Sequence, residues 1–206
     1  VVISIFAFVG IYKPLKEELE TGVISKFQDL TYNKHLMLEG KIKDDRNNAL
    51  SLSSGTGTED TMSMYLEGKV TLNKIQEITS THYNRIYENI DKENELKLVA
   101  RVARDGQLIY KIGDEDSVLD LIDWDKEKLT STYISDKDFV IIQSPIKTDG
   151  EVLGYDIIVR DIRPLIYEIQ ERKYAFSIYP HERDNEIVIE GNRLVSYVYS
   201  DFLEWT

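Results

Sequence analysis

The chain contains no cysteine, which excludes disulfide bonds, thiolate metal sites and thiol nucleophiles. Basic residues are scarce, because 25 Lys and Arg stand against 37 Asp and Glu and give a formal net charge of −12. This balance argues against nucleic acid as a partner, since a phosphate backbone needs a basic surface. We interpret the charge as a solvated acidic surface. At 206 residues and 42% hydrophobic content, the chain can bury a core of one large domain, or of a medium domain and a small one.

Catalytic and metal-binding motifs are also missing from the sequence. The three histidines, His35, His82 and His181, lie far apart, and none belongs to an HExxH motif. A Walker A loop and a GxSxG motif are absent too. The acidic segments 114–117 and 123–125 offer oxygen ligands, but lack the spacing and closing glutamate of an EF-hand loop. We therefore predict no catalytic site, no metal and no cofactor, and we expect that this chain is not an enzyme by itself.

The first ten residues, VVISIFAFVG, are uncharged and apolar apart from one serine and the closing glycine. Ten helical residues rise about 15 Å, which is half the hydrocarbon core of a bilayer, so they cannot span it alone. We interpret residues 1–10 as the remnant of a transmembrane helix, with a buried N-terminal strand as the alternative. Tyr12 and Lys13 favour the membrane because both are typical of its interface, and Pro14 can open a following helix.

One long helix is predicted from Pro14 to about Leu52, because apolar residues recur at spacings of three and four. A narrow apolar stripe on so long a helix predicts a stalk that pairs with a second copy in a parallel dimer. Small, flexible residues over 51–60 end the helix. The stripe consists of Leu15, Leu19, Val23, Phe27 and Leu30, and Leu38 and Ile42 resume it.

Two more helices are expected before residue 91. Thr58 or Thr61 can cap a short helix that ends near Gly68, and Thr71 can cap a longer one. The longer helix is expected to bury one apolar side, formed by Leu72, Ile75, Ile78, Ile86 and Ile90.

The pattern changes to β-structure at about Glu95. Two pairs of strand-like runs are joined at Asp105-Gly106 and at Asp149-Gly150, which are hairpin signals. A mixed segment, residues 114–132, lies between the hairpins. We therefore expect an antiparallel sheet in the second half of the chain.

A short helix over residues 162–173 follows, and the rest is strand-like with a turn at Gly191-Asn192. Helices first and an antiparallel meander afterwards predict the α+β class and exclude a doubly wound parallel sheet. The expected architecture is a long stalk helix and a helical pair packed on an antiparallel sheet, with a small C-terminal β module.

Four segments carry a resemblance to a known family. They are DRNNALSLSS at the end of the stalk, MYLEGKVTLNKI before the third helix, VARVARDGQLIYKIG in the first hairpin and SPIKTDGEVLGYDIIVRDIRPL in the second hairpin and exit helix. The chain from about residue 22 to 170 resembles the Cache family, the PAS-like PDC domains of bacterial sensor histidine kinases, diguanylate cyclases and chemoreceptors.

The resemblance implies an organisation and a function. We expect a transmembrane remnant at 1–10, a stalk helix at 11–54, a PAS-like sensor domain at 55–165 and a small membrane-proximal β module at 166–206. The implied function is that of an extracytoplasmic ligand-sensing domain, anchored in the cell membrane, in a histidine kinase of a two-component system. The alternatives are a diguanylate cyclase or chemoreceptor sensor, or a dimerisation and interaction domain without a ligand.

Arg101 places a charge in the middle of a predicted strand, with Val99 and Ala103 beside it on the same face. The resemblance implies that one sheet face packs on the long helices and the other lines a ligand cavity. A buried guanidinium needs an anion, because leaving it unpaired costs several kcal/mol. A ligand carboxylate can accept two parallel hydrogen bonds from it, so Arg101 is a candidate ligand-binding residue. The alternatives are a salt bridge to Asp156 or Asp161, or an exposed strand face.

The resemblance adds further candidates around the implied cavity, namely Tyr133, Gln143, Ser144, Tyr155 and Arg160. For each of them a packing or surface role is the alternative. Amino-acid binding in the family is marked by a set of spaced aromatic and charged residues. In this chain only Trp124 and Tyr133 correspond to members of that set. We therefore expect a small-molecule ligand, favour a carboxylate, and leave its identity open.

Overall fold

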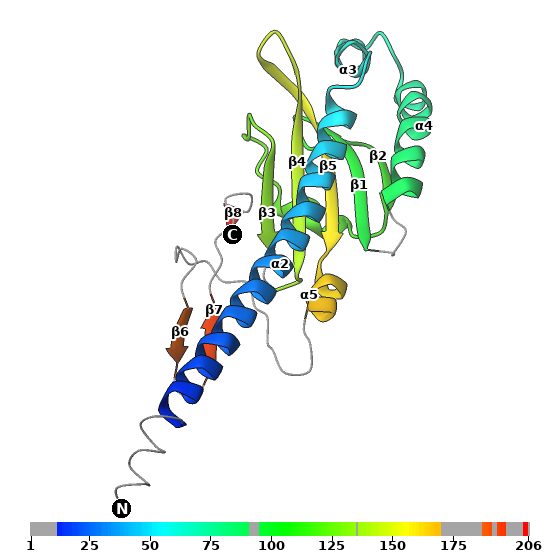
Figure 1. Cartoon of the computed structure of the whole chain (residues 1–206). Coiled ribbons are helices and arrows are strands. Elements are labelled where there is room, and N and C mark those ends of the chain that lie inside the picture. The colour runs from blue at the N-terminus through cyan, green and yellow to red at the C-terminus, as the bar shows by residue number, and fades with distance from the viewer. Residues whose placement is uncertain are drawn as a thin grey trace, which may run out of the picture. The chain divides into compact units, whose positions relative to one another are not determined.

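The computed structural model has the predicted α+β architecture (Figure 1). The chain divides into two compact units, one of residues 1–38 and 181–200 and the other of residues 39–180 and 201–206. The boundary between the units lies inside the first described helix. The structure describes residues 12–90, 95–134, 136–169, 187–190, 193–196 and 204–205.

Helix α2 (Lys13–Ser53) confirms the predicted long helix within one residue at each end. Leu15, Leu19 and Val23 of the predicted stripe are 52%, 61% and 60% exposed, whereas the later stripe residues turn inward. The predicted membrane remnant, residues 1–10, lies outside the described residues. Within the part of the chain that the structure describes, no helix has both the length and the apolar composition needed to cross a membrane.

Helix α3 (Thr58–Leu66) begins differently from the prediction. Its cap position is Gly57, in the left-handed conformation with φ 81°, and no side chain caps the helix. Both predicted caps donate instead of accepting, since the Thr58 hydroxyl bonds to the Leu52 carbonyl and the Thr61 hydroxyl bonds to the Gly57 carbonyl. The prediction of a threonine cap is therefore wrong for this helix.

Helix α4 (Leu72–Ile90) confirms the other cap, because the Lys74 amide donates to the Thr71 hydroxyl at 3.4 Å. Its buried stripe runs through Ile75, Thr79 and Tyr83, four residues apart. Ile78 is 48% exposed, so its predicted place on the buried side is wrong. Thr79 and Tyr83 occupy the buried side of α4 instead, because they bond to the buried charges Arg101 and Asp156 of the sheet.

Six strands form the main sheet, and five of them are antiparallel and follow the order β2-β1-β5-β4-β3 (Figure 1). The shortest of these five, β3, lies in a part of the chain that the sequence pattern left undefined. Their bounds are β1 (Leu96–Ala103), β2 (Leu108–Gly113), β3 (Thr130–Ile134), β4 (Phe139–Thr148) and β5 (Glu151–Asp161).

Both predicted hairpin turns are confirmed. Asp149 and Gly150, between β4 and β5, have φ values of 49° and 85°. Two successive left-handed residues match the type I′ turn, whose twist agrees with that of the flanking strands. Gly106 takes φ 85° in the turn between β1 and β2.

The C-terminal segment contributes residues to each of the two units. Helix α5 (Arg163–Ile169) starts one residue later than predicted, and the remainder of the predicted helix lies outside the described residues. Strands β6 (Ile187–Glu190) and β7 (Arg193–Ser196) form a separate antiparallel pair. Strand β8 (Glu204–Trp205) instead pairs in parallel with β3 of the main sheet, which the sequence did not predict.

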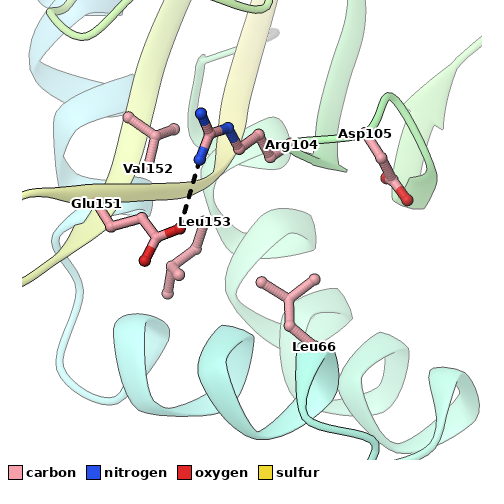
Figure 2. Close-up of a pocket in the computed structure, with 6 residues that line it drawn as sticks. All are labelled: Leu66, Arg104, Asp105, Glu151, Val152 and Leu153. Atoms are coloured by element: carbon pink, nitrogen blue, oxygen red, sulfur yellow. Dashed lines mark hydrogen bonds and ion pairs between the residues drawn. The ribbon is translucent and has the colours of Figure 1, made fainter.

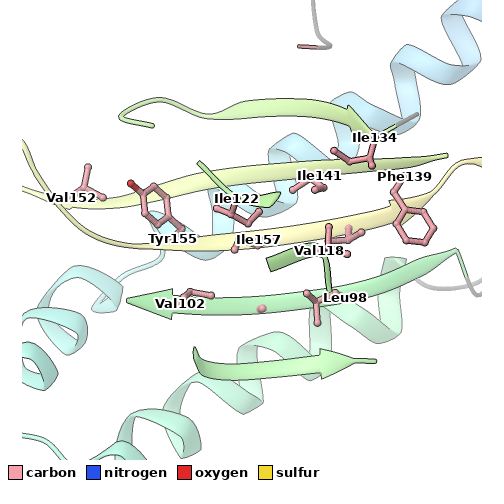
Figure 3. Packing of buried hydrophobic residues seen from close by; sticks show 12 residues of the cluster. Leu98, Val102, Val118, Ile122, Ile134, Phe139, Ile141, Val152, Tyr155 and Ile157 are labelled. Atoms are coloured by element: carbon pink, nitrogen blue, oxygen red, sulfur yellow. The ribbon is translucent and has the colours of Figure 1, made fainter. Parts of the chain in front are cut away.

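The two faces of the main sheet differ in chemistry. One face is apolar and packs against a short 3-10 helix, η2 (Asp116–Leu121), and the loop after it (Figure 3). Val118 and Ile122 from this segment insert among buried residues of β1, β3, β4 and β5, and Trp124 packs beside them. We call this the loop face. The opposite face contacts α2, α3 and α4, and we call it the helix face.

Candidate functional site

The helix face of the sheet buries charges and hydroxyl groups among its apolar residues. Every residue of this layer belongs to the unit that includes residues 39–180. Among the described residues, no buried side-chain nitrogen or oxygen lacks a hydrogen-bond partner. The layer consists of Arg101, Ser144, Asp156 and Arg160 from the sheet, Asp45 and Ser53 from α2, and Thr79 and Tyr83 from α4, none of them more than 4% exposed.

The first cluster is centred on Arg101. The register of β1 against β5 places Arg101 directly opposite Asp156, and both residues point to the helix face. The guanidinium binds the carboxylate with two hydrogen bonds, Nε to Oδ1 at 2.8 Å and Nη2 to Oδ2 at 2.9 Å. This bidentate geometry is the strongest form of an arginine–carboxylate contact.

Helix α4 and the end of α2 complete this cluster. The Tyr83 hydroxyl donates to Asp156 Oδ1, and the Tyr83 ring lies 5.5 Å from the guanidinium carbon of Arg101. Arg101 donates its Nη2 to the Leu52 carbonyl at 3.2 Å and its Nη1 to the Thr79 hydroxyl at 3.5 Å. Carbonyls in the last turn of a helix have no partner within it and carry partial negative charge, so they attract a cation.

The environment shifts the pKa values of this cluster. Burial lowers the pKa of Arg101, but the charges and hydrogen bonds of Asp156 and Tyr83 together outweigh it, and the net pKa lies above its usual value. Burial, reinforced by the charge of Asp156, raises the pKa of Tyr83 well above 10. Arg101 therefore stays charged and the Tyr83 hydroxyl stays a donor across the ordinary pH range.

The second cluster lies at the other end of β5, around Arg160. Its Nε and Nη2 donate to Asp45 of α2, with Nη2 to Oδ1 at 2.8 Å, and its Nη1 donates to Glu95 Oε2 at 2.5 Å. Lys41 Nζ lies 3.8 Å from the same Glu95 oxygen, so two cations face two carboxylates. Burial lowers the pKa of Arg160, but the hydrogen bonds and charges of Asp45 and Glu95 raise it above its usual value.

Two hydroxyl contacts complete the attachment of α2. Ser53 and Ser144 share a buried hydrogen bond of 2.7 Å, and Arg46 donates to the Ser131 hydroxyl at 2.8 Å. Counting the two clusters, residues 45–53 of α2 bond to β1, β3, β4 and β5. The end of the long helix is therefore tied to four strands through polar groups.

Three of the predicted ligand residues, Arg101, Ser144 and Arg160, belong to this layer. The sequence analysis left a salt bridge to Asp156 or Asp161, or an exposed strand face, as alternatives to ligand binding by Arg101. In the structure Arg101 forms the salt bridge to Asp156. The polar groups of all three residues bond to partners from the protein itself. Binding of a ligand by these residues stays a prediction.

The other predicted residues lie elsewhere. Gln143 and Tyr155 are on the loop face, where Gln143 Nε2 donates to the Asp123 carbonyl at 2.8 Å and the Tyr155 hydroxyl donates to the Trp124 carbonyl. The rings of Trp124 and Tyr155 are 5.8 Å apart. Tyr133 donates to Asp138 at the turn between β3 and β4. The six predicted residues are therefore divided between two faces and a turn.

The sequence analysis missed Asp45, Glu95 and Tyr83. A signal for Asp45 was present, because it falls between Ile42 and Ala49 in the buried stripe of α2, at spacings of three and four. A carboxylate in an apolar stripe needs a buried cation, and Arg160 is that cation.

An open hollow of about 440 Å³ lies at the tips of the two hairpins, beside the end of α3 (Figure 2). Arg104 and Glu151 form an ion pair of 3.4 Å across it, and both side chains are mostly exposed. No residue of the buried layer reaches it. The lining residues are Leu66, Arg104, Asp105, Glu151, Val152 and Leu153.

The chain matches no protein-family model, and no curated protein matches it. In the described residues, no group of three or more His, Cys, Asp or Glu side chains is placed to hold a metal ion. The likeness to the Cache family thus rests on the sequence segments quoted above.

Asp161, at the end of β5, makes stability dependent on pH. It accepts hydrogen bonds from the Arg163 amide at 3.0 Å and from Arg163 Nε at 2.9 Å, and Lys97 lies 3.5 Å away. Burial raises the pKa of Asp161, but the hydrogen bonds and charge of Arg163, together with the charge of Lys97, lower it by a larger amount. The net pKa is therefore below its usual value. The carboxylate therefore stabilises the fold at pH values above about 3.9, and this contribution disappears as the pH falls through the lowered folded-state pKa.

We expect Asp161→Asn to lower the free energy of unfolding at pH 7 by about 1 kcal/mol, a small value because Arg163 is half exposed. The difference between the variant and the parent protein should shrink below pH 4. Urea unfolding at pH 7, 5 and 3 measures it. A difference that stays constant across this range contradicts the assignment.

Proposed function

We propose that this chain is the extracytoplasmic ligand-sensing domain of a bacterial transmembrane receptor, with a sensor histidine kinase as the first candidate. A diguanylate cyclase or chemoreceptor sensor is the alternative within the class. The main support is the attachment of the 41-residue helix α2, whose last residues bond to four strands of one sheet. A movement of the sheet therefore acts directly on the last residues of this helix.

The loop face is the proposed place for the ligand. Gln143 and Tyr155 hold the loop by hydrogen bonds to the Asp123 and Trp124 carbonyls. A small molecule with its own polar groups can replace those carbonyls and displace the loop. The ligand then selects a second arrangement of the sheet and α2, in proportion to its preference for that arrangement.

A second copy of the chain is the proposed partner of the stalk. Leu15, Leu19 and Val23 are more than half exposed and lie four residues apart, so they form one ridge that can pack against another helix. Anchoring in a membrane raises the local concentration of the stalks, so a weak contact is enough. The rival proposal is a dimerisation domain without a ligand.

A thermal-shift screen of small carboxylates, amines and amino acids tests the sensor proposal on the purified chain. A true ligand at about 100 times its Kd stabilises the fold by about 2.7 kcal/mol, so we expect the Tm to rise by about 5–10 °C.

Gln143→Ala should reduce this shift, whereas Arg104→Ala at the hairpin tips should leave it unchanged. Loss of the shift in Arg104→Ala alone would move the site to the hollow of Figure 2. If no compound raises the Tm while the chain forms dimers, the ligand-free alternative is favoured.

A further inference from the structure

Both buried arginines of the sheet have a carboxylate partner that does not belong to α2. We infer that residues 39–53 of α2 form a detachable latch, whose release leaves the charges of the sheet paired. This inference rests on the proposed function only in giving the release a purpose, namely the transmission of a signal along the stalk.

Arg101 depends little on α2. Its bidentate partner Asp156 is on β5, and its other side-chain contacts, Thr79 and Tyr83, are on α4. Helix α2 supplies only the Leu52 carbonyl, at 3.2 Å. When the helix leaves, Arg101 loses one hydrogen bond and keeps its counter-charge.

Arg160 has the same arrangement with different residues. Glu95, just before β1, accepts from Nη1 at 2.5 Å, while Asp45 of α2 accepts from Nε and Nη2. When α2 leaves, Asp45 moves into water with the helix and Arg160 keeps Glu95. Breaking a buried ion pair is expensive chiefly because a charge stays buried without a partner. When α2 leaves, neither Arg101 nor Arg160 is left in the sheet without a carboxylate partner.

The contact of α2 with the helix face is partly apolar. Within residues 39–53 of α2 the buried apolar residues are Ile42, Ala49 and Leu52. On the sheet side of the same face, Val140, Ile142 and Ile158 are fully buried, and they alternate with the polar residues of β4 and β5. Release of α2 therefore exposes some apolar surface, whereas the hydroxyl and carboxylate groups of the contact regain hydrogen bonds from water.

Hydrogen exchange of the purified chain, followed by mass spectrometry, tests the latch. We expect amides of residues 39–53 to exchange by a local opening that leaves β1 and β5 protected. Asp45→Asn should speed exchange in residues 39–53 by about tenfold to a hundredfold, which corresponds to about 1.5–3 kcal/mol for bonds to a charged group. Exchange in β1 and β5 should not change.

Asp44→Asn is the matched control, because Asp44 is the exposed neighbour of Asp45 and loses the same charge. It should leave exchange in residues 39–53 as in the parent protein. Should Asp45→Asn fail to fold, Ser53→Ala decides in the same way, since among the described residues the Ser53 hydroxyl bonds to Leu50 and Ser144.

Joint exchange of residues 39–53 with β1 and β5, in the parent protein and in the variants, would show that α2 is an integral part of the fold and would overturn the latch. The measurement needs no ligand. Its outcome is therefore separate from that of the thermal-shift screen, which tests the sensor proposal.

Discussion

Replacing Asp156 by alanine is expected to lower the free energy of unfolding by about 3–5 kcal/mol. The change removes both carboxylate bonds of Arg101, which is only 4% exposed, and the acceptor of the Tyr83 hydroxyl. A guanidinium without a counter-charge then stays between β1 and α4. Urea unfolding followed by circular dichroism measures the loss.

Glu151→Ala is the matched control, because it also breaks an arginine–carboxylate pair of β5. The Arg104–Glu151 pair is mostly exposed, so we expect a loss of less than about 0.5 kcal/mol. The double change Arg101→Met with Asp156→Leu should recover much of the stability lost in Asp156→Ala, since no buried charge remains. A loss below about 1 kcal/mol in Asp156→Ala would contradict the role given to this pair.

Gly113→Ala is expected to lower the free energy of unfolding by about 2–5 kcal/mol. Gly113 closes β2 opposite Leu98 and has φ 101°, which residues with a Cβ rarely adopt. An added Cβ would lie 2.1 Å from the Lys97 carbonyl oxygen, so the two strands have to separate there. The same unfolding experiment measures the effect.

Gly106→Ala separates the two causes. Gly106 has φ 85°, but no atom lies within 4 Å of its added Cβ. We expect a loss of only about 1–2 kcal/mol, from the backbone conformation alone. Equal losses in the two variants would mean that the approach of Gly113 to Lys97 contributes nothing.

The elements predicted best are those with a local signal. Apolar spacing predicts α2 within one residue at each end, and the two Asp-Gly pairs locate both hairpins, because these patterns depend on neighbouring residues only. Strand β3 has no such signal. It is a five-residue segment of mixed polarity, and pairing with β4 determines its conformation.

The buried layer could be predicted in part. A charge in mid-strand identifies Arg101 as a residue that needs an anion, but the choice between Asp156 and Asp161 requires the register of β1 on β5. Asp44 and Asp45 of α2 show in the same way that the sequence does not identify which residue is buried. Neighbours differ by 100° around the axis, and contact with the sheet decides which of the two is buried.

The order of the strands has a consequence for biosynthesis. Strand β5 is the last of the five antiparallel strands to emerge from the ribosome, and it lies at the centre, between β1 and β4. Until it emerges, β1 has a partner on one side only, and its apolar residues Leu98 and Val102 lack their neighbours on β5. The nascent chain therefore presents an unpaired inner strand edge while residues 104–150 are synthesised, the state in which misassembly and chaperone binding occur.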